Sequence, residues 1–105
     1  MSKISKQFKE GYFERLFFCP GCCQVHGFRT KEWPEPPGLT DEEKELFKNK
    51  WTWNGDEEHP TLHPSIHVKD ETGTQCHCFV NNGFIQFLRD CKHRYKGKTM
   101  ELPDW

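Results

Sequence analysis

Three residues could together perform nucleophilic catalysis: Ser65, His77 and Asp90. A serine hydroxyl becomes a nucleophile when a neighbouring base takes its proton, and that base needs a carboxylate to orient it. Ser65 is one of three serines, and the other two, Ser2 and Ser5, lie in a polar N-terminal stretch. A serine, a histidine and an aspartate are common in a chain of this length, so their spacing alone favours structural roles.

Cysteine pairs suggest a second chemistry, the binding of a zinc ion. Cys19-Pro20-Gly21-Cys22 lies between two strand-like runs, which is the layout of a zinc knuckle, and Gly21 would permit the positive φ of its turn. Cys76 and Cys91 are the natural second pair, and four thiolates would close a structural zinc site. We therefore predict zinc as a structural cofactor bound by Cys19, Cys22, Cys76 and Cys91.

Other arrangements of these residues remain open. His93 could replace Cys76 as a ligand, and His26 could close a local site with the knuckle. Cys23 and Cys78 are left over and are expected to be small buried side chains. A disulfide framework is disfavoured because nothing at the N-terminus resembles a signal peptide, which indicates a cytoplasmic protein in a reducing compartment.

A β-hairpin is expected to position both groups. Two apolar, β-prone runs flank Asn82-Gly83, a strong signal for a two-residue turn. This register puts His77 opposite Leu88. Because side chains alternate between the two faces, Cys76 and Cys91 would share one face of the hairpin, while His77 and Asp90 would share the other.

The remaining elements are predicted from local patterns. Residues 12–18, 24–30, 50–53 and 100–105 are strand candidates. Thr40 and Glu43 form a capping box that begins a helix ending near Lys48. Residues 59–68 must be extended, because Pro60 and Pro64 would interrupt a helix, and Ser65 and His67 then lie on one face. The predicted fold class is small α+β, mainly antiparallel β hairpins with one short helix, stapled by a structural zinc.

Composition limits the size of the core. With 105 residues, 33% of them hydrophobic, and a mean hydropathy of -0.94, we expect residues 1–105 to form a single zinc-stabilised domain. Residues 1–10 are expected to be a frayed lead-in, and residues 31–49 a loop and helix insertion. No apolar run is long enough to cross a membrane, and the net charge of -1 gives no general attraction to nucleic acid.

Several motifs in combination resemble one protein family. These are Cys19-Pro20-Gly21-Cys22, Trp51-x-Trp53-Asn54-Gly55-Asp56, Pro64-Ser65-Ile66, Cys76-His77, and the run from Gly83 through Asp90-Cys91-x-His93. The family comprises small bacterial and phage proteins, some encoded in operons for ubiquitin-like protein conjugation, where they are regarded as unusual serine peptidases of the BubE type. The resemblance implies that Ser65 is the nucleophile and His77 the base. Hairpin geometry favours Asp90 as the third member over His93 or Asp56.

The predicted function is therefore a serine peptidase that removes a ubiquitin-like protein from its conjugates through an acyl-enzyme, with Trp51 and Trp53 as one wall of the tail site. The alternative is a non-catalytic, zinc-stabilised protein-binding module, phage-encoded and directed at a host antiviral defence pathway. Two further hypotheses are less favoured. One is a nucleic-acid binder that uses the basic residues of 92–98, and the other is a metal-dependent hydrolase that uses His59, His63 or His67.

Overall fold

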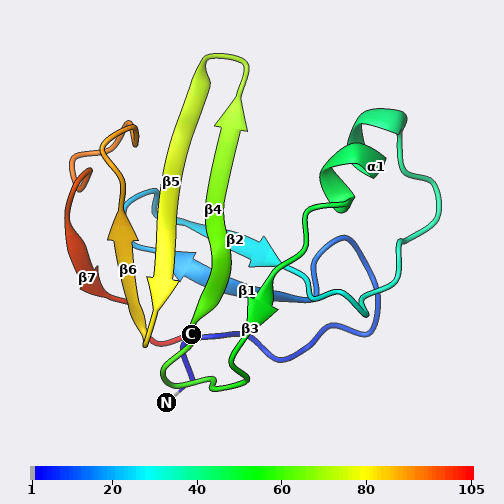
Figure 1. Ribbon diagram of the computed structural model, residues 1–105, viewed down its shortest axis with the longest axis horizontal. Helices are drawn as coiled ribbons and strands as arrows, with labels where there is room; N and C mark the ends of the chain where they lie inside the picture. The colour runs from blue at the N-terminus through cyan, green and yellow to red at the C-terminus, as the bar shows by residue number, and fades with distance from the viewer. Residues whose placement is uncertain (1) are drawn as a thin grey trace.

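The computed structural model describes residues 2–105, apart from the side chain of Asp70. It contains antiparallel strands and one short helix, as the sequence predicted, and the strands form two sheets (Figure 1). The smaller sheet pairs β1 (Arg15–Cys19) with β2 (Gln24–Phe28). The larger has the order β3-β4-β5-β6-β7, with β3 at Thr52–Trp53, β4 at Leu62–Asp70, β5 at Gly73–Asn81, β6 at Phe84–Phe87 and β7 at Thr99–Glu101. The helix α1 spans Asp41–Phe47.

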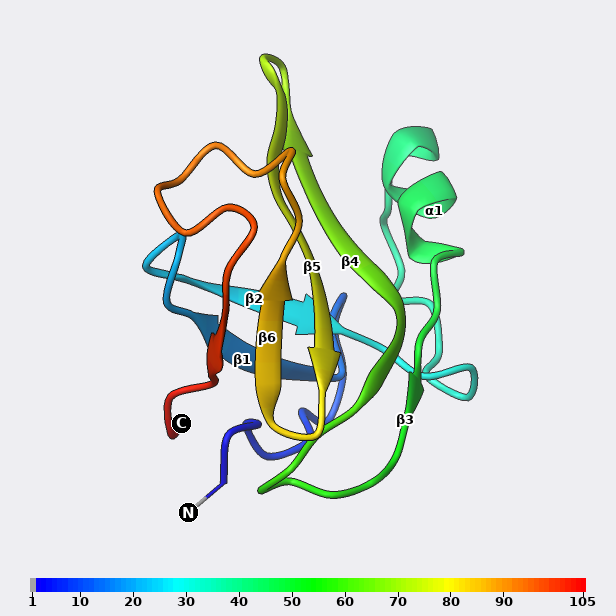
Figure 2. The same ribbon diagram turned by 60° about the vertical axis from the view of Figure 1, so that its left-hand side comes forward.

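The two sheets form two layers, and β1 and β2 cross β4 and β5 steeply (Figures 1 and 2). The core lies between them and includes Phe17 and Phe28 from the small sheet and Ile66, Val80 and Ile85 from the large one. Burial alternates along β5, where Cys76, Cys78 and Val80 are buried and the residues between them are at least partly exposed. One face of the large sheet is therefore covered by the small sheet, and its other face is open to solvent.

The β5–β6 hairpin has the predicted two-residue turn. Asn81 pairs with Phe84, and Asn82 and Gly83 have φ angles of 49° and 83°, as a type I′ turn requires. The ladder continues to Cys78 and Phe87, and the Leu88 amide then donates to the His77 carbonyl at 2.8 Å. His77 thus lies opposite Leu88, as expected.

The N-terminal residues are held on the domain, which differs from the frayed lead-in expected. Ile4 is 1% exposed, the Lys3 amide donates to the Glu57 carbonyl at 2.8 Å, and the Ser5 amide donates to the Leu16 carbonyl at 2.9 Å. The polar composition of residues 1–10 hid this role, because a single apolar side chain and backbone hydrogen bonds are enough to dock the segment.

The insertion of residues 31–49 lies beside β4 (Figure 1). Its helix begins with the predicted capping box, in which the Glu43 amide donates to Thr40 Oγ1 and the Glu43 carboxylate accepts from the Thr40 amide. Arg29 anchors the other end. Its side chain is buried and donates to the backbone carbonyls of Asn49 at 2.8 Å and Leu46 at 3.4 Å.

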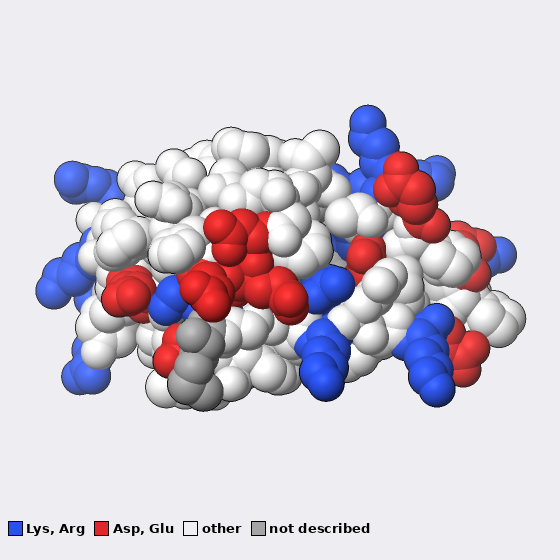
Figure 3. Space-filling model, turned by 90° about the horizontal axis from the view of Figure 1, so that it is seen from below, with Lys and Arg blue, Asp and Glu red and all other residues white. Residues whose placement is uncertain are grey.

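Charge is mixed over the surface. Viewed from below, acidic side chains gather near the centre of the face, and Lys and Arg lie mostly towards its rim (Figure 3). The described residues include no helix with the length and apolar character needed to cross a bilayer.

Candidate functional site

Ser65, His77 and Asp90 form a continuous chain of hydrogen bonds. Ser65 Oγ lies 3.0 Å from His77 Nε2, and His77 Nδ1 lies 3.0 Å from Asp90 Oδ2. The three side chains come from β4, from β5 and from the turn that follows β6, and they meet at the solvent face of the large sheet. The side chains of His77 and Asp90 are 24% and 48% exposed, so a substrate could approach them.

Ser65 occupies an irregular part of β4. The register between β4 and β5 shifts between Leu62 and Ile66, so the serine lies in the bulged segment. Bulges are common beside active sites because they change the direction in which a side chain points. The carbonyl of Ser65 accepts a hydrogen bond from Trp51 Nε1 at 3.4 Å, which ties the bulge to the chain leading into β3.

His67 lies beside the hydrogen-bonded chain of Ser65, His77 and Asp90, a position that the sequence did not predict. Its ring stacks on His77 with a centroid separation of 4.3 Å and an interplanar angle of 16°, and its Nε2 lies 2.6 Å from Thr74 Oγ1. The sequence places Ser65 and His67 on one face of β4, but it does not show that this strand pairs with β5. His67, His77 and Asp90 lie close enough to hold a metal, but the lone pairs of two nearly parallel rings do not converge on one point.

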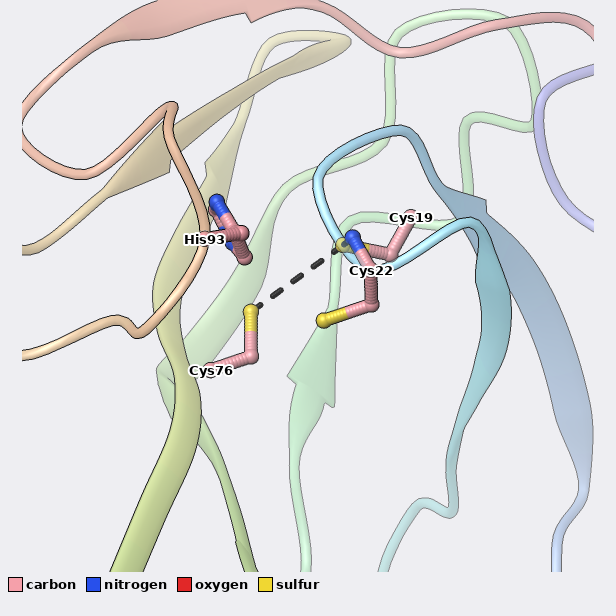
Figure 4. A group of neighbouring side chains, drawn as sticks. All are labelled: Cys19, Cys22, Cys76 and His93. Carbon is pink, nitrogen blue, oxygen red and sulfur yellow. Dashed lines mark hydrogen bonds between the residues drawn. The ribbon is translucent and has the colours of Figure 1, made fainter.

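A second cluster lies on the buried face of β5. Cys19, Cys22, Cys76 and His93 have their donor atoms within 4.8 Å of one another (Figure 4). The sulfurs of Cys19 and Cys76 are 4.0 Å apart, close to the ~3.8 Å expected for two thiolates on one tetrahedral zinc. His93 Nε2 is buried and has no hydrogen-bond partner among the described residues. Three thiols and an imidazole with a buried nitrogen that lacks a partner fit a structural zinc site.

The cluster differs from the predicted ligand set at one position, where His93 takes the place expected for Cys91. Cys91 Sγ accepts a hydrogen bond from the His77 amide and donates one to the His77 carbonyl, both at 3.2 Å. The prediction extended the strand alternation to residue 91, but β6 ends at Phe87 and the chain turns after it. His93 is instead held edge-on against Phe87, with a centroid separation of 4.5 Å.

The surroundings of the three thiols in this cluster raise their pKa values. The hydrogen bond with Cys76, together with burial, raises the pKa of Cys19 to about 12. Burial and the neighbouring Cys19 raise the pKa of Cys22 to about 11. The pKa of Cys76 is also raised, because Cys78 and burial outweigh the opposing effect of Cys19. A bound cation would have to displace the thiol protons, which couples metal binding to proton release.

The knuckle turn uses Gly21 differently from the prediction. The left-handed residue of the turn is Cys23, with a φ of 54°, and Gly21 is not among the positive-φ residues. A Cβ on Gly21 would overlap the imidazole of His93. Glycine is therefore needed here because His93 approaches the backbone closely.

A sequence model of one protein family matches this chain. It is described as "Bacterial ubiquitination-like system serine protease (BubE)", and it matches residues 3–88. The chain belongs to the BubE family. No curated protein and no solved structure matches the chain significantly.

The BubE match includes Ser65 and His77 and ends before Asp90 and His93. Of the alternatives for the third residue, Asp56 accepts hydrogen bonds from the backbone amides of Glu58 and His59, and His93 lies in the cysteine cluster. Asp90 is the residue whose carboxylate meets His77.

The described residues do not bring His59, His63 and His67 together as metal ligands. His59 and His63 belong to neither group of potential metal ligands found there. Of the basic residues after β6, Lys92 bonds Thr72 Oγ1 and Arg94 bonds the Tyr95 hydroxyl. Trp51 and Trp53 are half-buried and pack against the core, and Arg15 stacks on the Trp53 ring.

Proposed function

We propose that this chain is a serine peptidase that releases a ubiquitin-like protein by hydrolysing the ester or amide at its C-terminus. The observation that carries the proposal is the hydrogen-bonded chain from Ser65 through His77 to Asp90, with 3.0 Å between the bonded atoms at each step. The BubE family description supports the reaction class, and its ubiquitination-like system supports the kind of substrate.

The geometry suits one direction of proton transfer. If Nδ1–H of His77 donates to Asp90, Nε2 is free to accept the hydroxyl proton of Ser65. As Ser65 Oγ bonds to the substrate carbonyl carbon, its proton moves to Nε2, and the cationic ring is stabilised by the Asp90 carboxylate. The ring then gives that proton to the departing oxygen or nitrogen, which leaves an acyl group on Ser65.

Deacylation repeats these steps with water. A water molecule beside His77 loses a proton to Nε2 and attacks the acyl carbon, and the proton returns to Ser65 Oγ when the ester bond breaks. Asp90 takes no part in transferring this proton and acts by orienting the ring. Because about half of its side chain is exposed, we expect Asp90 to matter less than a buried orienting carboxylate would.

Zinc is proposed as a structural cofactor held by Cys19, Cys22, Cys76 and His93. Four protein ligands close the coordination shell of a tetrahedral zinc, which would provide folding energy and leave no position for substrate. The cluster lies on the buried face of β5, and the side chains of Ser65, His77 and Asp90 meet on its solvent face. The metal is therefore not expected to take part in acyl transfer.

The test uses a small fluorophosphonate and a ubiquitin-like protein that carries a C-terminal ester. Wild type should be modified at Ser65, located by mass spectrometry, and should cleave the ester. Ser65→Ala and His77→Ala should each lower turnover by at least about 10³-fold, and the double variant should be hardly worse, because both residues serve one proton transfer. Asp90→Asn should lower turnover by roughly 10–10²-fold and retain some labelling.

Three outcomes would contradict this assignment. Additive losses in the double variant would argue against a shared proton transfer. Labelling of Cys23 or Cys78 in place of Ser65 would make the protein a thiol peptidase. If nothing is labelled and no tail is cleaved, the better interpretation is a non-catalytic binding module, for which a phage origin and a host defence target remain predictions.

A further inference from the structure

One edge of β4 is open from Ser65 onward. β3 pairs with β4 at His63 and Leu62, and in the described residues no strand pairs with that side of β4 beyond His63. The ribbon shows β3 ending below this part of β4 (Figure 1). The free edge therefore begins at the proposed nucleophile.

Backbone groups of β4 point towards this open side. The amide and carbonyl of His77 are both used on the side of β5 away from β4, where they bond Cys91 and Leu88. The facing pair of His67 and His77 is therefore a non-hydrogen-bonded pair of the β4–β5 ladder, which agrees with the close stacking of the two rings. The amide and carbonyl of His67 consequently face outward, like the carbonyl of Ser65 that Trp51 contacts.

A groove of about 1180 Å³ runs along the same edge, between β4, β2 and the helix insertion. Ile66 and Val68 form part of its β4 wall, and Trp51 also lines it. Three of its lining residues are exposed apolar side chains, Phe8 at 41%, Val25 at 49% and Leu46 at 54%. An unpaired strand edge beside exposed apolar groups is the kind of surface that binds an extended peptide.

We propose that the C-terminal tail of the substrate binds as an additional antiparallel strand on the open edge of β4, with its terminal carbonyl opposite Ser65. This inference rests on the proposed function, because it takes the acyl group attacked by Ser65 to be the end of a tail. A tail antiparallel to β4 enters from the Lys69 end and finishes at Ser65. A parallel tail would have to enter from the other end, where β3 and Trp51 occupy the edge.

This register assigns each tail residue to a face. Counting back from the terminal residue opposite Ser65, the third residue lies opposite His67 and exchanges two backbone hydrogen bonds with it. The second and fourth lie opposite Ile66 and Val68 and direct their side chains into the groove. The structure therefore assigns apolar residues to the second and fourth positions, and small residues to the first and third, which lie on the face of the His67–His77 stack.

The test compares the rates at which peptide phosphonates label Ser65. The parent probe is fluorescein-tagged leucyl-glycyl-leucyl-glycine with a diphenyl phosphonate in place of its terminal carboxylate. One variant is N-methylated at the third residue from the end, whose N–H would donate to the His67 carbonyl. The matched control is N-methylated at the second residue, whose N–H would point away from β4.

Methylation at the third residue should slow labelling by at least about tenfold, because one hydrogen bond is lost and the methyl group meets the strand edge. Methylation at the second residue should change the rate by less than about threefold. Equal effects would overturn strand addition at this edge. A larger effect at the second residue would overturn the antiparallel register.

Protein variants test the groove independently. Val25→Asp and Leu46→Asp should slow labelling by the peptide probe several-fold, and labelling by a small fluorophosphonate should be unchanged. Phe84→Asp is the matched control, because Phe84 is 46% exposed on β6 and does not line the groove. If Phe84→Asp slows the peptide probe as much as the groove variants do, the groove assignment is wrong.

A binding measurement separates this inference from the proposed function. Isotope-labelled Ser65→Ala is titrated with the same peptide bearing a plain C-terminal carboxylate, and amide shifts are followed by NMR. Shifts centred on His67 and Lys69 would support strand addition even if Ser65 proves not to be a nucleophile. Labelling of wild-type Ser65 by the phosphonate without such shifts would retain the peptidase and overturn the edge site.

Discussion

Cys91 and His93 lie two residues apart in the sequence and contact different groups. Cys91 bonds both backbone groups of His77, and His93 directs an orphaned buried nitrogen at three thiols. The pair therefore connects the chain after β6 to the backbone of β5 and to the cysteine cluster. Its two members should respond differently to substitution.

We predict that His93→Ala reduces zinc affinity by at least about tenfold, because one of four ligands is lost. Cys91→Ser should leave zinc content at one per chain and slow the labelling of Ser65, since the hydroxyl is a shorter partner for the His77 backbone. Elemental analysis and competition with a chromophoric chelator measure the first effect, and fluorophosphonate labelling the second. Loss of zinc from Cys91→Ser with retention in His93→Ala would restore the original four-cysteine assignment.

His67 should make stability depend on pH. Burial, together with the neighbouring His77 and Lys69, lowers the pKa of His67, and Asp90 opposes this in part. The unfolded chain therefore takes up a proton near pH 6.5 that the folded protein binds less readily, so stability falls as pH decreases through that value. His67→Phe keeps an aromatic ring against His77 but cannot take up a proton.

We therefore predict that urea unfolding of wild type loses more stability between pH 7.5 and pH 5.5 than unfolding of His67→Phe. Both proteins contain the same cysteine cluster, so effects of acid on zinc cancel in the comparison. If the difference in free energy of unfolding between wild type and His67→Phe stays constant, or if wild type becomes relatively more stable at low pH, His67 does not contribute in this way.

The two clusters differ in how much of each was predictable. The contact between His77 and Asp90 followed from a turn dipeptide that fixes the register, together with strand alternation. His93 was an alternative ligand in place of Cys76, and its position in place of Cys91 was not predicted, because alternation no longer applies once β6 ends at Phe87. The stacking of His67 depends on which strand pairs with β4, and a local pattern does not contain that information.

Among the elements, the link between β2 and α1 depends on a buried arginine. Arg29 donates to the carbonyls of Tyr12, Leu46 and Asn49 and stacks on the rings of Tyr12 and Phe47. Burial lowers the pKa of its guanidinium. The charged fork adds donors at the C-terminal end of the helix insertion, where the Leu46 carbonyl also accepts from the Asn49 amide. Its partners lie 17 to 20 residues away in the sequence. The local pattern therefore predicted the helix but not the arginine that holds it.

We predict that Arg29→Met lowers the free energy of unfolding by about 2–4 kcal/mol, because the Tyr12 and Asn49 carbonyls lose this donor and the stacking on Tyr12 and Phe47 is lost. Lys48→Met is the control. Lys48 is 72% exposed and pairs with Glu45 at the surface, so its loss should have little effect. Chemical denaturation measures both variants, and equal losses would mean that Arg29 does not anchor the insertion.

Two glycines have a ring packed directly against their backbone, Gly21 at the cysteine cluster and Gly27 away from it. A Cβ on Gly21 would overlap His93, and a Cβ on Gly27 would overlap the ring of Phe13. Gly21→Ala should weaken zinc binding by displacing His93, whereas Gly27→Ala should lower stability and leave one zinc per chain. Thermal unfolding and metal content distinguish the two effects. Unchanged zinc affinity in Gly21→Ala would show that His93 is not a ligand.

At the scale of the whole molecule, the cysteine cluster connects the two sheets. Cys19 comes from β1, Cys22 from the knuckle turn, Cys76 from β5, and His93 from the chain after β6. A domain with 33% hydrophobic residues has few other means of holding its layers together. A metal at this point would therefore stabilise the packing of one layer on the other.

We predict that removal of zinc by a strong chelator unfolds the protein or lowers its melting temperature by at least about 10 °C. Circular dichroism with elemental analysis measures this, and Ser65→Ala should behave like wild type. A metal-free protein with unchanged melting would mean that the hydrophobic core is sufficient. Loss of metal in Ser65→Ala would mean that the two sites are not separate.

Cys76 and His77 are consecutive residues of β5, and they carry the two chemistries on opposite faces of one strand. Inserting or deleting one residue within the strand would exchange those faces, placing a thiol beside Ser65 and an imidazole among the cysteines. Inserting or deleting two residues would return each side chain to its original face. Changes of length in homologous chains should therefore occur in even steps along β5, and odd steps should be confined to the turn at residues 71–72, where the parity of the strand is not affected.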